Sequence, residues 1–551
     1  MEVAWFQMFL AAVAGLVALS LLRLVRWLSF LFLAFCPFLS CKLISQGVLY
    51  LAVLVPGLAV PSYPPYPATV PLGFVMGEPL SPLVVPVRHE RFAAVEANLK
   101  EKNSPVIAFI SHDRIQVIVN DAEIAKQLFV DSKLFPKPPA LYDVIRVFGE
   151  NIVSISETGP QWKKQRSLCS PAFSIANLKL VSNVVVSSCH KLFQEWETKA
   201  THKGPRWEVQ VDMLHEINKT ALAIISEAGF GSEIVFEPEE GTRHTLSFWN
   251  CMNNVVDLLW LRLGLPNVVK FVPFGKPKVA KDSFAEFEHY INEFIVDRKN
   301  KQNAEVGESV GRADLLSLLL RAEDPHSNIR LTDEEIRANI FIFLVAGHET
   351  TSHTLAFSFA LLACHPDAQQ KVYEEVQRLL QEKMASGEQS EQLTYDDYKK
   401  LNYTMCVFKE ALRMYPPVNM VPKMAAEDVM ISGYLIPKNT TISVALNVLH
   451  RNEKYWQEPD IFKPERFLKM GEDSGTSVNP YAFAPFSGGR RSCLGMKFAE
   501  VEAVLLLASI VRSFSIHVPP GVEPATLFEI KIGLTATPKH GTQLLLRNRA
   551  S

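Results

Sequence analysis

The ten residues Phe486-Ser-Gly-Gly-Arg-Arg-Ser-Cys-Leu-Gly495 decide how this chain of 551 residues is interpreted. Their Phe-x-x-Gly-x-Arg-x-Cys-x-Gly pattern fixes five residue types, and such a match arises by chance in about one of several thousand chains of this length. A cysteine in a glycine-rich loop that leads into a helix can present a thiolate to a metal ion. The pattern therefore indicates a metal-binding thiolate at Cys493.

The neighbours of Cys493 favour a flat cofactor. Gly489 and Gly495 let the backbone pass close to such a group, while Arg491 and the N–H groups of a helix expected at 495–509 favour an anion. A thiolate bound to haem iron donates electron density that favours O–O cleavage. An ordinary buried cysteine is the bland alternative, and zinc is disfavoured because no Cys-x-x-Cys pair exists and the nearest other cysteine is Cys406.

Independent segments then resemble one family, the cytochrome P450 monooxygenases. They occur in the family's order: Trp162 with Arg166, Ala346-Gly-His-Glu-Thr-Thr351, Glu410-Ala-Leu-Arg413, Phe462-Lys-Pro-Glu-Arg-Phe467 and the cysteine loop. The resemblance covers roughly residues 85–545. It implies the family's fold, mainly α-helical with small β-sheets.

The same resemblance implies a role for each residue. Cys493 is the expected axial ligand of the haem iron. The expected haem-binding residues are Trp162, Arg166, Phe486, Gly489, Arg491 and Gly495. Thr350 is expected to hydrogen-bond during oxygen activation and Glu349 to relay protons, whereas Glu410, Arg413 and Arg466 are expected to form a structural brace behind the cysteine loop.

A long helix is expected to carry Glu349 and Thr350. Thr332-Asp-Glu-Glu335 is a capping box, so a helix should begin there and continue to about Ala363. Its apolar middle, 340–346, should be buried. The Thr350 hydroxyl can bond the carbonyl four residues back and loosen the helix locally, although an ordinary buried threonine does the same.

The substrate pocket is expected, from the resemblance, at 135–154, 340–346, 417–421 and 532–535. Most of these side chains are apolar. His348 is expected to line the pocket or to pack beside it. One departure is Lys423, where many relatives have arginine: a lysine can pair with a haem propionate but cannot form the bidentate fork, which leaves its role open.

The amino-terminal residues predict a membrane anchor. Residues 3–22 carry no charge and are long enough to cross a bilayer, and Arg23 and Arg26 follow them. A cleaved signal peptide is disfavoured because Glu2 replaces a basic start. Two further apolar runs leave one to three membrane segments open, so we expect an anchor at 1–60, a proline-rich hinge at 61–84 and a catalytic domain at 85–551.

Composition excludes other classes. With 56 basic and 58 acidic residues, the chain has no charge excess that would indicate a nucleic-acid partner. Its 8 cysteines form no disulfide framework, which fits a domain that faces the reducing cytosol. No Gly-x-Gly-x-x-Gly fingerprint follows an expected strand, so flavin and dinucleotide should be bound by a separate protein.

The expected function is that of a haem-thiolate monooxygenase in the endoplasmic reticulum membrane, with haem b as cofactor. Electrons would come from NADPH through NADPH-cytochrome P450 reductase, which could dock near Lys163, Lys164, Arg490 and Lys497. The substrate would be lipophilic, for example a terpenoid, and the sequence is similar to fungal members that act in secondary-metabolite biosynthesis. The alternatives are a haem-thiolate isomerase or dehydratase, and a non-catalytic membrane protein that binds lipid.

Overall fold

The computed structural model describes residues 105–111, 114–200, 207–232, 244–259, 275–304, 314–321, 330–388, 390–468 and 479–549. The expected anchor, the expected hinge and the start of the expected catalytic domain lie outside these residues. Among the described helices, none alone is long and apolar enough to span a membrane. The segments Pro160–Phe173 and Ile175–Lys199 reach that threshold only as a pair, with a bend of 54° between them.

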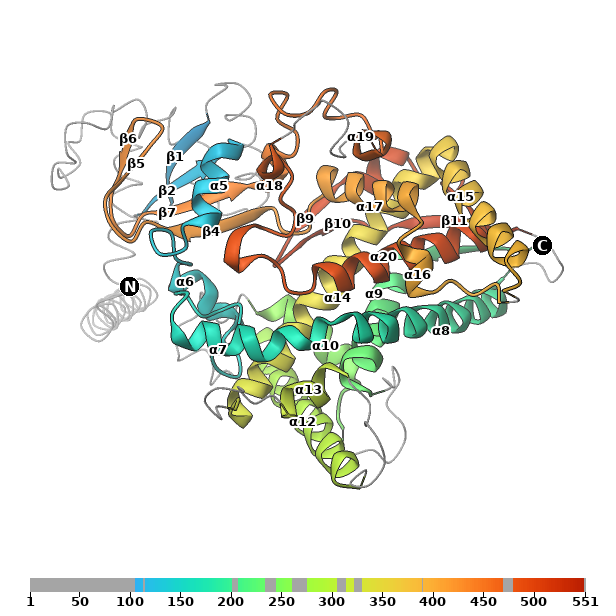
Figure 1. The fold of residues 1–551 in the computed structure, drawn as a ribbon, viewed down its shortest axis with the longest axis horizontal. Helices are drawn as coiled ribbons and strands as arrows, with labels where there is room; N and C mark the ends of the chain where they lie inside the picture. The colour runs from blue at the N-terminus through green and yellow to red at the C-terminus, as the bar shows by residue number, and fades with distance from the viewer. Residues whose placement is uncertain are drawn as a thin grey trace, which may run out of the picture. The chain divides into compact units, whose positions relative to one another are not determined.

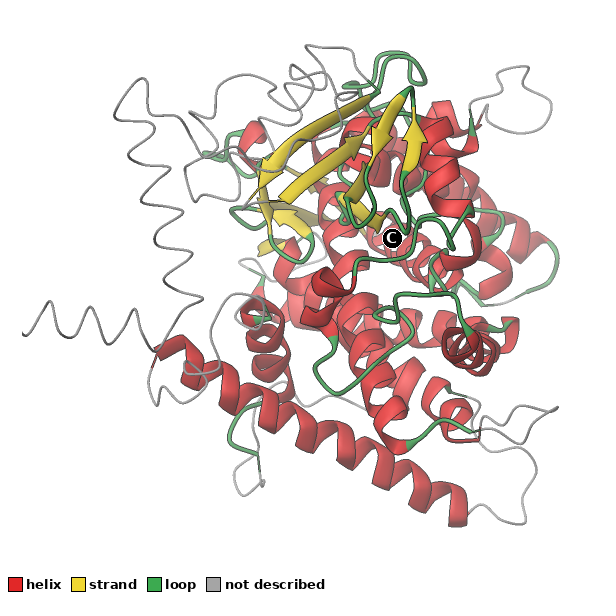
Figure 2. Cartoon of the chain, turned by 90° about the vertical axis from the view of Figure 1, so that its left-hand side faces the viewer, coloured by secondary structure: helices red, strands yellow, loops and turns green. Residues whose placement is uncertain are grey.

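Helices form most of the described chain, as Figures 1 and 2 show. In chain order they are α5 (Ala122–Val130), α6 (Pro139–Tyr142), α7 (Pro160–Cys169), α8 (Ile175–Lys199), α9 (Met213–Ile224), α10 (Phe248–Leu258), α12 (Gly275–Ala304), α13 (Leu315–Arg321), α14 (Asp333–Cys364), α15 (Pro366–Ala385), α16 (Tyr395–Tyr398), α17 (Asn402–Met414), α18 (Leu446–Leu449), α19 (Glu465–Leu468) and α20 (Met496–Ser513). A π-helical turn, Ile225–Gly229, continues α9.

Small sheets complete the fold. The largest has the strand order β1 (Val106–Ser111), β2 (Arg114–Val119), β7 (Thr441–Ala445) and β4 (Met420–Met424), in which only β2 and β7 are parallel. A second sheet has the order β3 (Glu208–Asp212), β11 (Gln543–Asn548) and β8 (Phe514–His517), all antiparallel. Two hairpins remain, β5 (Val429–Ile431) with β6 (Tyr434–Ile436) and β9 (Ile530–Ile532) with β10 (Ala536–Pro538). The expected fold class, mainly helical with small sheets, is confirmed.

Helix α14 crosses the middle of the helical part (Figure 1). It begins as the sequence predicts, because the Thr332 hydroxyl accepts from the Glu335 N–H and the Glu335 carboxylate accepts from the Thr332 N–H. Most of its residues are buried, and they belong to two hydrophobic clusters, one with α8, α15, α17 and α20 and the other with α10, α12 and α13. Ala346 is exposed and Gly347 partly exposed, so the surface of the helix is accessible near its centre.

Candidate active site

The cysteine loop is a tight turn that aims Cys493 inward. The Cys493 N–H donates to the Phe486 carbonyl at 3.0 Å. Gly489 has a φ of +65°, and a Cβ atom there would lie 2.3 Å from the carbonyl oxygen of Phe129 in α5. Glycine is thus required at this position by the turn and by the contact with α5. Gly489 does not line the cavity described below, whereas Gly495, expected beside it as a haem neighbour, does.

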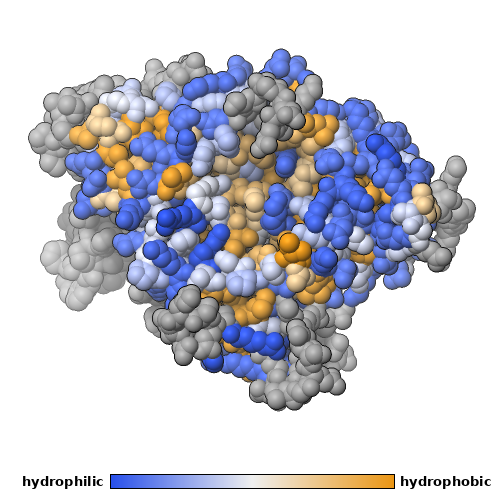
Figure 3. Space-filling view, viewed as in Figure 1, coloured by the Kyte–Doolittle hydropathy of each residue, from blue (hydrophilic) through white to orange (hydrophobic). Residues whose placement is uncertain are grey.

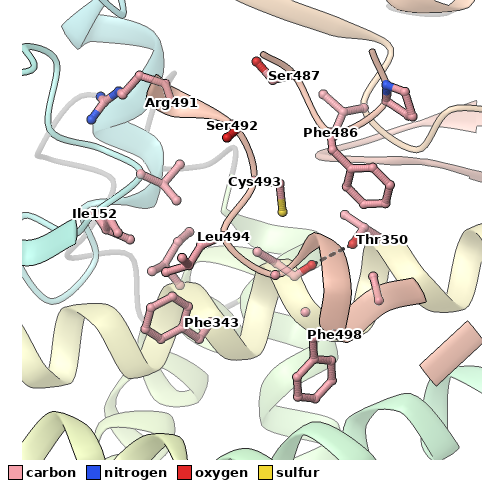
Figure 4. A pocket seen from close by; sticks show the side chains of 18 of the residues that line it. Ile152, Phe343, Thr350, Phe486, Ser487, Arg491, Ser492, Cys493, Leu494 and Phe498 are labelled. Carbon is pink, nitrogen blue, oxygen red and sulfur yellow. Dashed lines mark hydrogen bonds between the residues drawn. The ribbon is translucent and has the colours of Figure 1, made fainter. Parts of the chain in front are cut away.

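A cavity of about 320 Å³ lies between this loop and the centre of α14. Figure 4 shows Cys493, Phe486, Leu494, Phe343 and Thr350 around it. Its apolar wall includes Ile152, Val153, Phe173, Ile225, Leu315, Ile342, Phe343, Ala346, Phe408, Leu412, Pro417, Val418, Val421 and Phe498. Three of the four expected pocket segments contribute. Ile532 to Thr535 do not line the cavity, and the Thr535 hydroxyl instead contacts Glu349 and His353 of α14.

Cys493 is exposed to this cavity. The surrounding protein atoms raise the pKa of its thiol, and a backbone hydrogen bond from Gly495 and the charge of Arg166 partly oppose that rise. A metal ion at the sulfur would stabilise the thiolate far more strongly, because a coordinating thiol loses its proton. Cys493 therefore has open access on the cavity side and the features of a ligand position.

One end of the cavity is lined by cations. Arg166 donates from Nη1 to the Ser492 carbonyl at 3.0 Å, and Arg491 donates to the Ile155 carbonyl while its guanidinium lies 4.9 Å from the centre of the Trp162 ring. The Nη1 atom of Arg491 is buried, and none of the described residues forms a hydrogen bond with it. The three residues that the sequence assigned to haem binding on this side are therefore brought together.

Two lysines join this end of the cavity. Lys423 is 2% exposed, and burial followed by the charge of Arg491 lowers its pKa to about 8. Lys137 donates to the Val153 carbonyl at 2.7 Å, and burial, Arg491 and Lys423 lower its pKa well below the usual value. No carboxylate is among the described residues that line the cavity. Such a cluster of partly buried cations, with no carboxylate among the described residues of the lining, fits an anionic group, and the two propionates of haem meet that requirement.

The sequence left the role of Lys423 open and gave no indication that Lys137 belongs to the site. The cavity contains both ammonium groups, together with Tyr142, whose ring lies 4.5 Å from Lys137 Nζ. Neither a lysine in the loop before α6 nor a lysine in the short strand β4 carries a local pattern that indicates such a contact. Only the packing of the 135–154 segment against the cysteine loop reveals it.

Thr350 and Glu349 face different surroundings. Thr350 lines the cavity, and its hydroxyl donates to the Ala346 carbonyl at 2.8 Å, the bond that the sequence predicts. Glu349 does not line the cavity, and burial raises the pKa of its carboxyl to about 7. His348 is buried and bonds the Leu344 carbonyl through Nδ1, so it packs beside the helix instead of lining the cavity.

Glu410, Arg413 and Arg466 form the expected network. Arg413 donates to both oxygens of Glu410, at 2.8 and 2.9 Å, and Arg466 donates through Nε at 3.0 Å. The side chains of Glu410 and Arg413 are 0% exposed. Arg413 also donates to the His450 carbonyl, and His450 Nε2 accepts from the Ala484 N–H just before the cysteine loop. The network thus supports that loop from behind.

The comparisons with known proteins agree with this arrangement. The sequence profile described as Cytochrome P450 matches residues 79–545. The chain belongs to the cytochrome P450 family. It is 34% identical over 417 residues to cytochrome P450 monooxygenase 124 of Postia placenta, covering 73% of this chain and 75% of that protein. It is 33% identical over 379 residues to cytochrome P450 3A6 of Oryctolagus cuniculus, covering 67% and 70%.

The fold comparison points the same way. The structure matches the crystal structure of the cytochrome P450DA heme domain with a TM-score of 0.71 and 26% identity, over 85% of this chain and 95% of that one. As a cytochrome P450 the chain is an oxidoreductase that uses haem iron, and electrons from NADPH through a reductase are typical of the family.

Proposed function

We propose that this cytochrome P450 is a monooxygenase that inserts one oxygen atom of dioxygen into a lipophilic small molecule. The observation that carries the proposal is the cavity in which Cys493, Thr350 and a cationic end wall meet. Bound haem would supply the activation of dioxygen, with a thiolate as the ligand that favours O–O cleavage.

Several polar residues in or beside the cavity then have a proposed role. Cys493 would hold the haem iron through its thiolate. The haem propionates would be held by Arg166, Arg491, Lys137, Lys423 and the Trp162 ring nitrogen, which line one end of the cavity. Thr350 offers a hydroxyl to the same cavity, and Glu349, with a pKa of about 7, can give or take a proton at neutral pH.

The substrate class follows from the remaining wall. Its side chains are apolar, so a terpenoid, fatty acid, sterol or polyketide fits better than a charged metabolite. Figure 3 shows that apolar side chains also gather in the middle of the face viewed in Figure 1.

The fungal relative carries the name monooxygenase, and we propose a step in secondary-metabolite biosynthesis. The uncharged run 3–22 supports a further proposal, an anchor in the endoplasmic reticulum membrane.

For electron supply we propose NADPH-cytochrome P450 reductase, docked on the side of the cysteine loop. Lys163, Arg490 and Lys497 are exposed there. Lys164 is less available, because its ammonium group lies 2.8 Å from the Glu335 carboxylate in a half-buried ion pair. Charge reversal at Lys163 should therefore slow reductase-driven turnover more than the same change at Lys164.

The test has two stages. The reduced protein should show a carbon monoxide difference band strongly red-shifted from that of imidazole-ligated haem, and Cys493→Ala should abolish it. The loaded enzyme is then incubated with reductase, NADPH, ¹⁸O-labelled dioxygen and a panel of terpenoids, fatty acids and sterols. One labelled oxygen atom should enter the product. Conversion without uptake of dioxygen would instead establish the isomerase or dehydratase alternative, and a well-folded protein without haem would refute both.

A further inference from the structure

Thr535, in the turn between β9 and β10, contacts two titratable side chains of α14. Its Oγ1 atom lies 3.2 Å from Glu349 Oε2 and 3.0 Å from His353 Nδ1. Glu349 and His353 are four residues apart, so they share one face of the helix. Thr535 is 8% and His353 6% exposed. The threonine hydroxyl therefore bridges the carboxylate and the imidazole inside the protein.

The direction of these hydrogen bonds follows from the protonation states. Burial, and then the neighbouring His348, lower the pKa of His353 to about 3, while burial raises that of Glu349 to about 7. Any shared proton consequently rests on Glu349, and His353 stays neutral. With the Glu349 carboxyl ionised, the Thr535 hydroxyl donates to it. The His353 ring, which also hydrogen-bonds the Ala536 backbone, places Nδ1 3.0 Å from the same hydroxyl.

Other groups around Glu349 modify this picture only slightly. Asp257 of α10 adds negative charge that raises the pKa of Glu349 further. From α9 the neutral amide oxygen of Asn218 accepts from the hydroxyl of Ser352, which also donates to the Glu349 carbonyl. Among the described residues Thr535 is the one group whose hydrogen bond lowers the pKa of the Glu349 carboxyl. It is thus the contact that favours the ionised form.

The bridge also fixes where the carboxylate lies. Thr350 lines the cavity and Glu349, its neighbour in sequence, does not. The hairpin that carries Thr535 is itself attached to the cavity wall, because the Ala536 N–H donates to the Pro417 carbonyl at 2.8 Å and Pro417 lines the cavity.

We propose that Thr535 is the positioning residue for Glu349, holding its carboxylate against the β9–β10 hairpin and outside the cavity, with His353 orienting the threonine hydroxyl. This inference rests on the proposed function, in which Glu349 supplies protons. Thr535 itself touches neither substrate nor haem in this assignment. It acts through the acid that it holds.

The direct test measures the Glu349 carboxyl itself. The infrared band of the protonated carboxyl is followed against pH in the full-length, haem-loaded protein, and Glu349→Gln identifies the band by removing it. Thr535→Val should raise the midpoint by about one pH unit, since a hydrogen bond to the charged form is lost. Thr535→Ser should restore the wild-type midpoint. A midpoint that Thr535→Val leaves unmoved would overturn the inference.

Thr537→Val is the matched control. It makes the same chemical change in β10, and within the described residues no hydrogen bond joins the Thr537 hydroxyl to Glu349 or His353. Its titration should equal that of the wild type. The carbon monoxide band verifies that every variant folds and carries haem. If Thr535→Val does not fold, Thr535→Ser still decides the question: a Glu349 midpoint in Thr535→Ser that differs from the wild-type value would count against the inference.

A second measurement separates this inference from the proposed function. Reductase-driven consumption of dioxygen is recorded without added substrate, together with the fraction released as hydrogen peroxide. Glu349→Gln and Thr535→Val should each raise that fraction at least twofold. If Glu349→Gln leaves it unchanged, the proton-supply role in the proposed function is wrong. If Glu349→Gln raises it and Thr535→Val does not, only the positioning role is wrong.

Discussion

Replacement of Glu410 by glutamine removes the charge at the centre of the brace behind the cysteine loop. The Glu410 carboxylate accepts from Arg413 at 2.8 and 2.9 Å, from Arg466 at 3.0 Å and from the Lys463 N–H at 2.9 Å. Glutamine keeps the shape but presents an N–H₂ group to donors that surround the site. It therefore leaves the buried Arg413 guanidinium without its counter-charge.

The expected cost is large. Removing one partner of a buried ion pair destabilises a protein by about 3–5 kcal/mol, out of a total free energy of unfolding of about 5–15 kcal/mol. An ordinary surface ion pair three residues apart in a helix would cost only a few tenths of a kcal/mol. The 0% exposure of both side chains decides for the larger value.

The assay is urea unfolding, followed by tryptophan fluorescence and by loss of the carbon monoxide band. Glu458→Gln provides the control, because Glu458 forms an exposed ion pair with Lys463 at 3.3 Å and should lose less than about 1 kcal/mol. Glu410→Gln should lower the free energy of unfolding by at least about 3 kcal/mol. A loss below about 1 kcal/mol would refute the argument, because the network would then be no stronger than a solvated pair.

Three further predictions concern the cavity and its loop. Lys423→Met should weaken haem retention, measured as the rate of haem transfer to apomyoglobin, while Lys423→Arg should retain haem at least as well as the wild type. Gly489→Ala should lower the urea midpoint, since its Cβ would lie 2.3 Å from the Phe129 carbonyl oxygen. Gly495→Ala should leave the unfolding of the haem-free protein unchanged, because its Cβ would lie 3.8 Å or more from protein atoms, and should weaken haem binding instead. The raised pKa of Glu349 means that the folded state holds this proton more tightly than the unfolded state. The resulting contribution to the free energy of unfolding is lost as the pH rises from about 4.5 to about 7. Glu349→Gln should therefore reduce the fall in the urea midpoint between these pH values.

The sequence predicted the parts of the site that depend on local patterns. The capping box at Thr332 defined the start of α14, and the motif around Cys493 indicated both the turn and the ligand. The role of Gly489 was predicted less well, because a positive φ and a contact with a distant carbonyl cannot be told apart from an approach to a cofactor in sequence alone. Glycine satisfies either requirement.

Contacts between distant segments were the least predictable. Lys137 and Lys423 meet Arg491 only because a loop, strand β4 and the cysteine loop converge at the cavity. Likewise, Thr535 was expected to line the pocket, whereas its hydroxyl bonds Glu349, which lies 186 residues earlier in the chain. Hairpin residues alternate in direction, so a shift of one position changes what a side chain reaches.

Strand β11 has a consequence for synthesis of the protein. It lies between β3 and β8, both of which precede it in the chain. Neither neighbour can be paired until the ribosome has passed Asn548, and a product that stops before Gln543 would display two unpaired strand edges at once. Exposed edges of this kind recruit other chains. Chains that end before β11 would therefore be expected to aggregate or to be degraded. Only a chain that includes β11 can complete this sheet.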